Sequence, residues 1–263
     1  MAPRVLKHLA VALFVCLAAA TVRSQAPNAP TRQAVIDELV IANHILANEG
    51  VLDGYGHVSV RNPANPNRYF LARAGAPAVV TAADIVEYDL DSNATTSASA
   101  MGYQERFIHG EIYKARPDVT AAIHCHCLEV IPFADTSVPL RPMYHMGYFI
   151  GEGVPVFEIR KTAGLTDMLV RDAKLGKALA QSLGQKSAAL MRGHGAVVVG
   201  GSIPTVVGRS VYLDVNARAQ AQAIALGGKI TYVEADEAKL RMSDTGEYAR
   251  AWDLWKRKVA SLK

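Results

Sequence analysis

The sequence lacks the features that mark several common classes of protein. Its 263 residues contain 3 cysteines, which is too few for the disulfide framework of a small secreted domain. The net charge is only +4, and no run of Lys and Arg is interleaved with aromatic residues, which argues against a nucleic-acid-binding protein. A Gly-x-Ser-x-Gly motif, the signature of a nucleophile-elbow hydrolase, is also absent. With 50% hydrophobic and 20% charged residues, the composition is that of an ordinary globular enzyme.

The one long apolar run lies at the N-terminus. A basic start at Arg4 and Lys7 is followed by an uncharged stretch from Leu9 to Val22 and by the small residues 24–26, which is the pattern of a secretory signal peptide. This run is shorter than the roughly 20 residues that a transmembrane helix needs. We therefore predict a signal peptide at residues 1–26. The mature chain, residues 27–263, would be exported, most consistently to the periplasm, with no membrane association after signal removal.

Hydrophobic periodicity predicts a mixture of strands and helices. Helical spacing occurs at residues 32–49, 105–116, 166–183, 206–226 and 235–262, and strand patterns occur at 54–61, 68–73, 85–89, 119–126, 187–192 and 196–199. Turn residues link the first strands as hairpins, and there is no repeated strand-helix-strand unit. We therefore predict an α/β fold, a three-layer α/β/α sandwich with a mainly antiparallel central sheet. It would form a single domain over 27–263, with a helical tail at 233–263 anchored by Trp252 and Trp255.

The segment His124-Cys125-His126-Cys127 carries the clearest chemical signal. Side chains two apart in a strand share a face, so His124 and His126 can reach one cation while the cysteines point away. His194 stands between glycines directly before another strand, and it can supply a third ligand. Three neutral imidazoles with one open position are typical of a catalytic metal site. Zinc suits three imidazoles and manganese would add oxygen ligands, so we predict one divalent ion per subunit, zinc or manganese.

The cysteines offer two alternatives to this interpretation. Cys125 and Cys127 could act as soft metal ligands in place of the histidines. Only the strand face that carries His124 and His126, however, has a further ligand available in His194. They could also form a disulfide, but residues so close together in an extended strand are expected to bridge only with strain. Cys16 falls in the signal segment. We therefore predict no disulfide framework.

With these motifs in order along the chain, the sequence resembles the class II aldolase/adducin family. The resemblance spans residues 32–227 and is carried by the segments 56–61, 105–109, 113–118, 122–126 and 190–195. It implies an α/β/α sandwich, commonly a homotetramer with active sites between subunits. It also implies a divalent metal on His124, His126 and His194, with Glu105 as the catalytic carboxylate. The rival carboxylate, Glu111, lies at a different helical phase.

The sequence departs from the sugar-phosphate aldolases of this family where those enzymes hold phosphate. Their Gly-Asn, Thr-Gly and Ser-Ser segments correspond here to residues 56–57, 74–75 and 103–104. The resemblance is closer to the family's hydroxyaromatic branch, which decarboxylates hydroxy-substituted benzene or pyridine carboxylic acids. Cationic, forked and aromatic side chains suit a planar carboxylate, so we predict substrate contacts by four residues: His57, Arg73, Tyr103 and His145. Alternatively, Arg73 pairs with Asp84 or Glu87, and Tyr103 serves packing.

These residues predict a divalent-metal-dependent carbon–carbon lyase that decarboxylates a small hydroxyaromatic or hydroxypyridine carboxylic acid. The ion would stabilise negative charge, and Glu105, partly protonated in an apolar setting, would act as acid and base. His109, one helical turn later, is predicted to orient that carboxylate, or else to be a buried polar residue with a local hydrogen bond. Two other functions stay open: an aldolase or dehydratase acting on an unphosphorylated hydroxycarbonyl compound, and a non-catalytic adducin-like interaction module.

Overall fold

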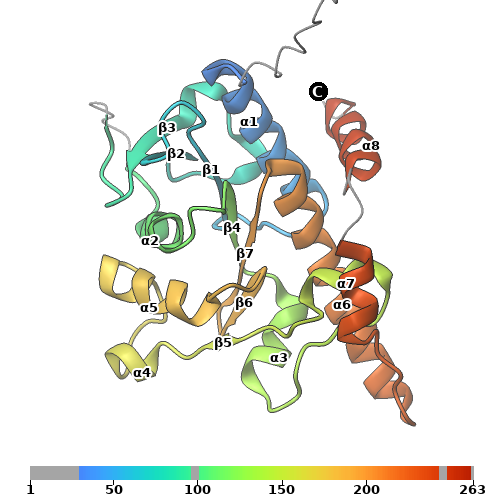
Figure 1. Ribbon diagram of the computed structural model, residues 1–263. Coiled ribbons are helices and arrows are strands. Elements are labelled where there is room, and N and C mark those ends of the chain that lie inside the picture. Colours follow the sequence, from blue (N-terminus) through green and yellow to red (C-terminus); the bar gives the residue numbers. More distant parts are fainter. Residues whose placement is uncertain (1–29, 96–100, 243–247, 262–263) are drawn as a thin grey trace, which may run out of the picture.

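A single seven-stranded sheet forms the centre of the protein. The computed structural model describes residues 30–95, 101–242 and 248–261; the predicted signal peptide lies outside them, so export stays a prediction. The strand order is β3-β2-β1-β4-β7-β6-β5 (Figure 1). The strands are β1 (His57–Arg61), β2 (Arg68–Ala72), β3 (Ile85–Asp89), β4 (Ala121–Cys125), β5 (Val156–Phe157), β6 (Ala188–Met191) and β7 (Gly195–Gly200). All neighbouring pairs are antiparallel except β5 and β6, which confirms the predicted mainly antiparallel sheet.

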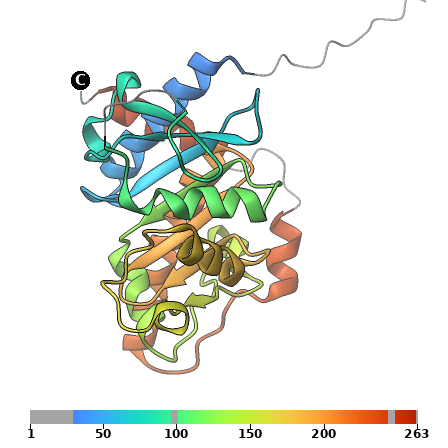
Figure 2. The same cartoon turned by 90° about the vertical axis from the view of Figure 1, so that its left-hand side faces the viewer.

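Helices cover both faces of the sheet and form the predicted three layers. One face carries α1 (Arg32–Asn48), α6 (Ile203–Leu226) and α8 (Ala249–Ala260), and the other carries α2 (Phe107–Ala115) and α5 (Ala173–Leu183), as Figures 1 and 2 show from two sides. Along β7, Val198 belongs to the apolar cluster of the first face, whereas Val197 and Val199 belong to that of the second. Because both faces of β7 are buried, the strand needs its unbroken run of apolar residues.

The C-terminal tail is helical, as predicted, but in two pieces. These are α7 (Ala235–Met242) and α8, and the residues between them, 243–247, lie outside the described part of the chain. Trp252 and Trp255 are 6% and 4% exposed and belong to the core cluster that includes α1 and α6, so both are packing anchors. The remaining short helices are α3 (Ile131–Asp135) and α4 (Arg160–Ala163). No helix in the described segments is both long enough and apolar enough to cross a membrane.

The helix predicted at residues 166–183 is shorter than its sequence pattern. α5 begins only at Ala173, because the side chain of Asp172 accepts a hydrogen bond from the Leu175 N–H at 2.8 Å and caps the helix. The preceding residues are irregular, and Met168 adopts a left-handed φ of 68°. This irregular segment, residues 164–172, lies against the functional site.

Candidate metal centre

Two neighbouring strands bring three histidines together at one end of the sheet. His124 lies in β4, His126 directly follows it, and His194 lies in the turn between β6 and β7. β4 and β7 pair antiparallel, with Cys125 opposite Ala196, so the end of β4 meets the start of β7. Together with Glu105, the three histidines offer ligand atoms that all lie within 4.8 Å of one another. The sequence-predicted ligand set is therefore assembled as expected.

Each imidazole is oriented by a protein acceptor at its outer nitrogen. The three Nδ1 contacts are His124 to the Ala196 carbonyl oxygen at 3.2 Å, His126 to an Asp53 carboxylate oxygen at 3.1 Å, and His194 to the Met168 carbonyl oxygen at 3.0 Å. A neutral ring that donates from Nδ1 keeps its lone pair on Nε2. This is how proteins orient histidines that bind metals.

The Nε2 atoms of the three rings point toward one another, and with the protons on Nδ1 none of them has a proton to donate to its neighbours. His126 Nε2 and His194 Nε2 are 3.2 Å apart, and His124 Nε2 is buried with no hydrogen-bond partner among the described residues. Lone pairs that face one another at this distance repel unless a cation lies between them. Three imidazole nitrogens and one carboxylate oxygen are a donor set for a divalent first-row metal. The residues present therefore fit the metal that the motifs predicted.

Glu105 completes the cluster from a different element. It lies in the short 3-10 turn Gln104–Arg106 that leads into α2, and it is 7% exposed. Its Oε2 lies 3.4 Å from Nε2 of both His124 and His194, and its Oε1 accepts a hydrogen bond from the Val170 N–H at 2.8 Å. The carboxylate thus stands where a fourth ligand would stand.

The charge of Glu105 differs from the sequence prediction. Burial alone would raise the pKa of this carboxyl, but the adjoining imidazoles of His124 and His194 outweigh burial and hold the pKa well below its ordinary value. This direction is opposite to the one from which a partly protonated Glu105 was predicted, because that prediction considered the apolar setting without the neighbouring rings. An ionised carboxylate can act as a base before it acts as an acid.

The glycine after His194 is required by close packing. Gly195 has a φ of +151°, and a Cβ there would lie 2.0 Å from the Cys125 carbonyl oxygen and 2.9 Å from the His126 Cα. A side chain at this position would push β7 away from the end of β4 and separate His194 from His126. The Gly-His-Gly sequence is thus a packing requirement of the site as well as a motif.

We expect Gly195→Ala to lower the free energy of unfolding by about 2–4 kcal/mol and to weaken metal binding at least about tenfold, because the clash moves the ligand-bearing strands apart. Thermal unfolding and titration with zinc would measure the two effects. Gly201→Ala is the matched control, since nothing lies within 4 Å of a Cβ at Gly201, and its effect should stay within about 0.5 kcal/mol. Equal behaviour of the two variants would contradict the packing argument.

A cavity of about 510 Å³ adjoins the cluster. Its wall includes two of the predicted substrate residues, His57 and Tyr103, together with Glu105 and His126. The rest of the wall is made by Gly54, Tyr55, Ala74, Gly75, Ala76, Met101, Gly102, Gln104 and Leu169. None of these lining residues is Lys or Arg, so a ligand's negative charge has the metal site and neutral donors to bind to.

Tyr103 has a structural role as well as a place in the wall. Its hydroxyl donates a hydrogen bond to the Gly75 carbonyl oxygen at 2.5 Å, and burial raises its pKa to about 12. The phenol is therefore neutral at physiological pH, and its proton is already used within the wall. The ring lies 4.5 Å from that of His57, centroid to centroid, with the two planes tilted by 41°, so the two rings pack against each other in the wall.

Two of the predicted substrate contacts are not in the cavity. Arg73 Nε lies 2.6 Å from Asp84 Oδ1 on the exposed surface, so the alternative interpretation, a pair with Asp84, describes this structure. His145 is exposed in the 3-10 segment His145–Ile150 and packs edge-to-face on Tyr144. Neither residue lines the cavity, because sequence order alone does not tell on which side of the sheet a loop returns.

His109 is a buried partner of His57 rather than of Glu105. Its Nε2 lies 2.6 Å from His57 Nδ1 and its Nδ1 lies 2.6 Å from Ser59 Oγ. The prediction that it orients Glu105 was wrong, because Glu105 precedes the α-helix and does not share its phase. Sequence reasoning missed Ser59 and Tyr113, although each has a positional signal: Ser59 shares the strand face of His57, and Tyr113 lies one turn after His109.

The two cysteines correct another prediction, because Cys125 and Cys127 form a disulfide. β4 ends at Cys125, so the chain turns where an extended strand was expected and the Cα atoms are 5.3 Å apart, an ordinary separation for a disulfide. Both side chains belong to the apolar cluster on the face that carries α1 and α6. The sulfur atoms are bonded to each other, so the alternative in which they replace the histidines as ligands does not apply.

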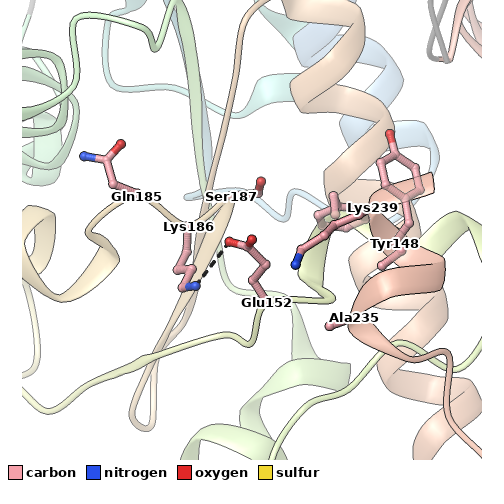
Figure 3. A pocket seen from close by; sticks show the side chains of 9 residues that line it. Tyr148, Glu152, Gln185, Lys186, Ser187, Ala235 and Lys239 are labelled. Atoms are coloured by element: carbon pink, nitrogen blue, oxygen red, sulfur yellow. Dashed lines mark hydrogen bonds and ion pairs between the residues drawn. The ribbon is translucent and has the colours of Figure 1, made fainter. Parts of the chain in front are cut away.

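A second, smaller cavity of about 50 Å³ lies elsewhere on the surface (Figure 3). Its wall includes Tyr148, Lys186 and Glu152, and Lys186 Nζ lies 3.3 Å from Glu152 Oε2. None of the four cluster residues lines it. It has room for only a few water molecules. The cavity beside the histidines is the candidate site because its wall includes Glu105 and His126 of the cluster.

Comparison with known proteins agrees with this geometry. The family model "Class II Aldolase and Adducin N-terminal domain" matches residues 37–221. The chain is 38% identical over 240 residues to "Decarboxylase tropJ" of Talaromyces stipitatus, which covers 82% of this chain and 90% of that protein. It is 27% identical over 244 residues to a 3,4-dihydroxyphthalate decarboxylase of Arthrobacter keyseri, covering 86% of this chain and 93% of that one.

A solved structure has the same fold. The L-fuculose 1-phosphate aldolase from Glaciozyma antarctica PI12 superposes with a TM-score of 0.72 at 23% identity, over 90% of this chain and 94% of that chain. Decarboxylases and aldolases of this kind are lyases, and the family model covers more than half of the sequence. The chain therefore belongs to the class II aldolase and adducin family, and it is an enzyme of the lyase class.

Proposed function

We propose that this protein is a divalent-metal-dependent carbon–carbon lyase that decarboxylates a small hydroxyaromatic or hydroxypyridine carboxylic acid. The observation that carries the proposal is a cluster of three imidazoles and one carboxylate at the edge of a cavity whose other described lining residues include no acidic or basic side chain besides the histidines. A flat aromatic ring fits such a wall. Among the described residues the wall has no Lys or Arg. Residues 56–57, 74–75 and 103–104 also lack the Gly-Asn, Thr-Gly and Ser-Ser segments that hold phosphate in the sugar-phosphate aldolases of the family.

The residues of the cluster would divide the chemistry between them. A divalent ion on His124, His126 and His194, zinc or manganese, would supply a Lewis acid that stabilises negative charge on substrate oxygens. Glu105 is ionised and adjoins that position, so it can accept the proton of a substrate hydroxyl. When the carbon–carbon bond breaks, carbon dioxide leaves and the bonding electron pair stays on the ring. The protonated Glu105 can then return its proton to the ring carbon.

An aldolase acting on an unphosphorylated hydroxycarbonyl compound is the second candidate. The same cluster would stabilise an enediolate, and the fold is shared with an L-fuculose 1-phosphate aldolase. The cavity wall favours the decarboxylase, because the rings of Tyr103 and His57 can pack against a planar aromatic substrate. The two reactions differ in their products, which are carbon dioxide in the first and two carbonyl fragments in the second.

We expect purified protein loaded with zinc or manganese to release carbon dioxide from at least one member of a set of hydroxybenzoic, dihydroxyphthalic and hydroxypyridine carboxylic acids, with 3,4-dihydroxyphthalate included because a relative acts on it. Carbon dioxide and the decarboxylated ring would be measured together by a coupled assay and by chromatography. The His194→Ala variant serves as the control for spontaneous loss of carbon dioxide. Carbonyl fragments from hydroxycarbonyl compounds, with no carbon dioxide from any aromatic acid, would reject the decarboxylase in favour of the aldolase.

The homotetramer with active sites between subunits is part of this proposal. Tyr55 and Met101, which line the cavity, are 75% and 78% exposed in the single chain. Apolar side chains exposed at the mouth of a site are typical of surfaces that a neighbouring subunit covers. Light scattering in solution would give the mass of the assembly directly.

A further inference from the structure

A chain of buried hydrogen bonds leads from the protein interior to the cavity. Tyr113 Oη lies 2.8 Å from Ser59 Oγ, Ser59 Oγ lies 2.6 Å from His109 Nδ1, and His109 Nε2 lies 2.6 Å from His57 Nδ1. All four side chains are at most 1% exposed. His57 is the end of this chain that lines the cavity, and its remaining polar atom is Nε2.

The direction of these bonds follows from proton counting. Tyr113 has one hydroxyl proton, and the Ala122 N–H donates to the phenol oxygen, so the phenol proton goes to its other partner, Ser59 Oγ. Ser59 has one proton too, and it must then donate to His109 Nδ1. The opposite direction would leave the phenol proton of a fully buried tyrosine without an acceptor among the described residues, which costs about 1–3 kcal/mol.

The same counting fixes both imidazoles. A His109 ring that accepts at Nδ1 carries its proton on Nε2, and burial lowers its pKa to about 3, so it is neutral at physiological pH. Its Nε2–H donates to Nδ1 of His57. His57 then carries its own proton on Nε2, the atom left for the cavity.

We propose that Tyr113, Ser59 and His109 fix His57 as the tautomer whose Nε2–H donates into the cavity, where it binds an anionic oxygen of the substrate. His57 stands opposite His124 in the pairing of β1 and β4, with ring centroids 5.2 Å apart, so its donor lies beside the metal position. The inference rests on the proposed function for the nature of the ligand, an aromatic acid. The three inner residues are positioning residues, because they act through His57.

A donor fixed in this way makes the site select ligands that present a hydrogen-bond acceptor to His57 Nε2. A fixed N–H donor binds a carboxylate, phenolate or hydroxyl oxygen and leaves an N–H group of a ligand unpaired. It adds a second point of attachment beside the metal, in a wall whose described residues include no Lys or Arg. Two such points hold a planar ring in one orientation.

The tautomers can be read without any substrate. The measurement is NMR spectroscopy of zinc-loaded protein labelled with 15N at histidine. The two-bond couplings between the carbon-bound ring protons and the ring nitrogens report which nitrogen carries hydrogen. We expect Nε2–H on both His57 and His109, with the His57 signals assigned by their loss in His57→Gln. Hydrogen on Nδ1 of His57 would overturn the proposal even if decarboxylation had been observed.

Variants of His109 test the donor function. In His109→Gln, the amide oxygen can accept from Ser59 and the amide nitrogen can donate to His57, so the polarity is kept, whereas His109→Met has a similar volume and can do neither. Calorimetric titration of the zinc-loaded proteins with 3,4-dihydroxyphthalate should give the Gln variant an affinity close to wild type and the Met variant at least about tenfold weaker binding, at equal zinc content. Equal affinities of the two variants would overturn the proposal.

A small change in β1 gives a further check if the Met variant does not fold. Ser59→Ala removes the donor to His109 Nδ1 and changes only one buried hydroxyl. We expect the Nδ1–H form of His57 to become populated in this variant. Unchanged tautomers would show that Ser59 does not set the polarity and would reject the inferred direction. Failure of the proposed function would instead appear as absence of carbon dioxide from every acid, with the tautomers as expected.

Discussion

Replacing His194 with alanine is expected to remove bound metal and turnover together. The ring supplies one of the converging nitrogens and lies 3.4 Å from Glu105, so its loss leaves two imidazoles from one strand segment. Lewis-acid stabilisation is worth several kcal/mol in such sites, and each 1.36 kcal/mol is a factor of ten. We therefore expect turnover to fall by at least about 10³-fold. Metal content by plasma mass spectrometry and initial rates on the same preparation would test both losses.

His145→Ala provides the matched control for this experiment. It is the same substitution at an exposed histidine outside the cavity, and it should leave the metal content and the rate unchanged. Circular dichroism of both variants would establish that each is folded. A His194→Ala protein that keeps full activity without metal would remove the metal from the mechanism.

Glu105→Gln is expected to keep the metal and lose turnover. The amide oxygen can still accept the Val170 N–H bond at the position of Oε1, so the irregular segment should stay in place, and the three imidazoles still hold the ion. The amide cannot accept a proton from the substrate and return it. General acid–base catalysis is worth about 10²–10⁴-fold, and we expect a loss of that size in kcat.

Glu111→Gln is the control for Glu105. Glu111 is the other buried carboxylate of this region, but it pairs with Lys114 at 2.6 Å and is absent from the cluster. Its replacement should change kcat less than about threefold, since it touches no reacting group. An unchanged kcat in Glu105→Gln would exclude Glu105 from proton transfer, and loss of metal in that variant would make it a required ligand instead.

Local sequence patterns predicted most of the fold, because burial imposes a fixed periodicity. The strand face shared by His124 and His126 and the helical stripe of residues 32–49 both follow from this rule. Residues 166–172 have apolar spacing too, but they are not helical. There the Met168 carbonyl oxygen faces His194 Nδ1 and the Val170 N–H binds Glu105. These tertiary hydrogen bonds outweigh the weak local preference for helix.

Some residues of the candidate site could likewise be predicted from local sequence patterns, and others could not. The three histidines could be found from spacing alone, since strand geometry determines which side chains share a face. The hydrogen bond between His109 and His57 could not, because the two residues lie far apart in the sequence and only the fold brings them together. For Arg73 the sequence predicts either a substrate contact or a pair with Asp84 or Glu87, and the fold decides for the pair with Asp84.

The metal ligands and the cavity wall come from different kinds of structure. His124 lies within the central sheet, and His126 and His194 lie at the ends of the interior strands β4 and β7. Much of the cavity wall, by contrast, consists of connecting residues at 54–55 and 74–76. Replacements in those connections leave the pairing of the strands intact. Related enzymes can therefore acquire new substrates by replacing residues of these connections alone, while the metal ligands on the strands stay the same.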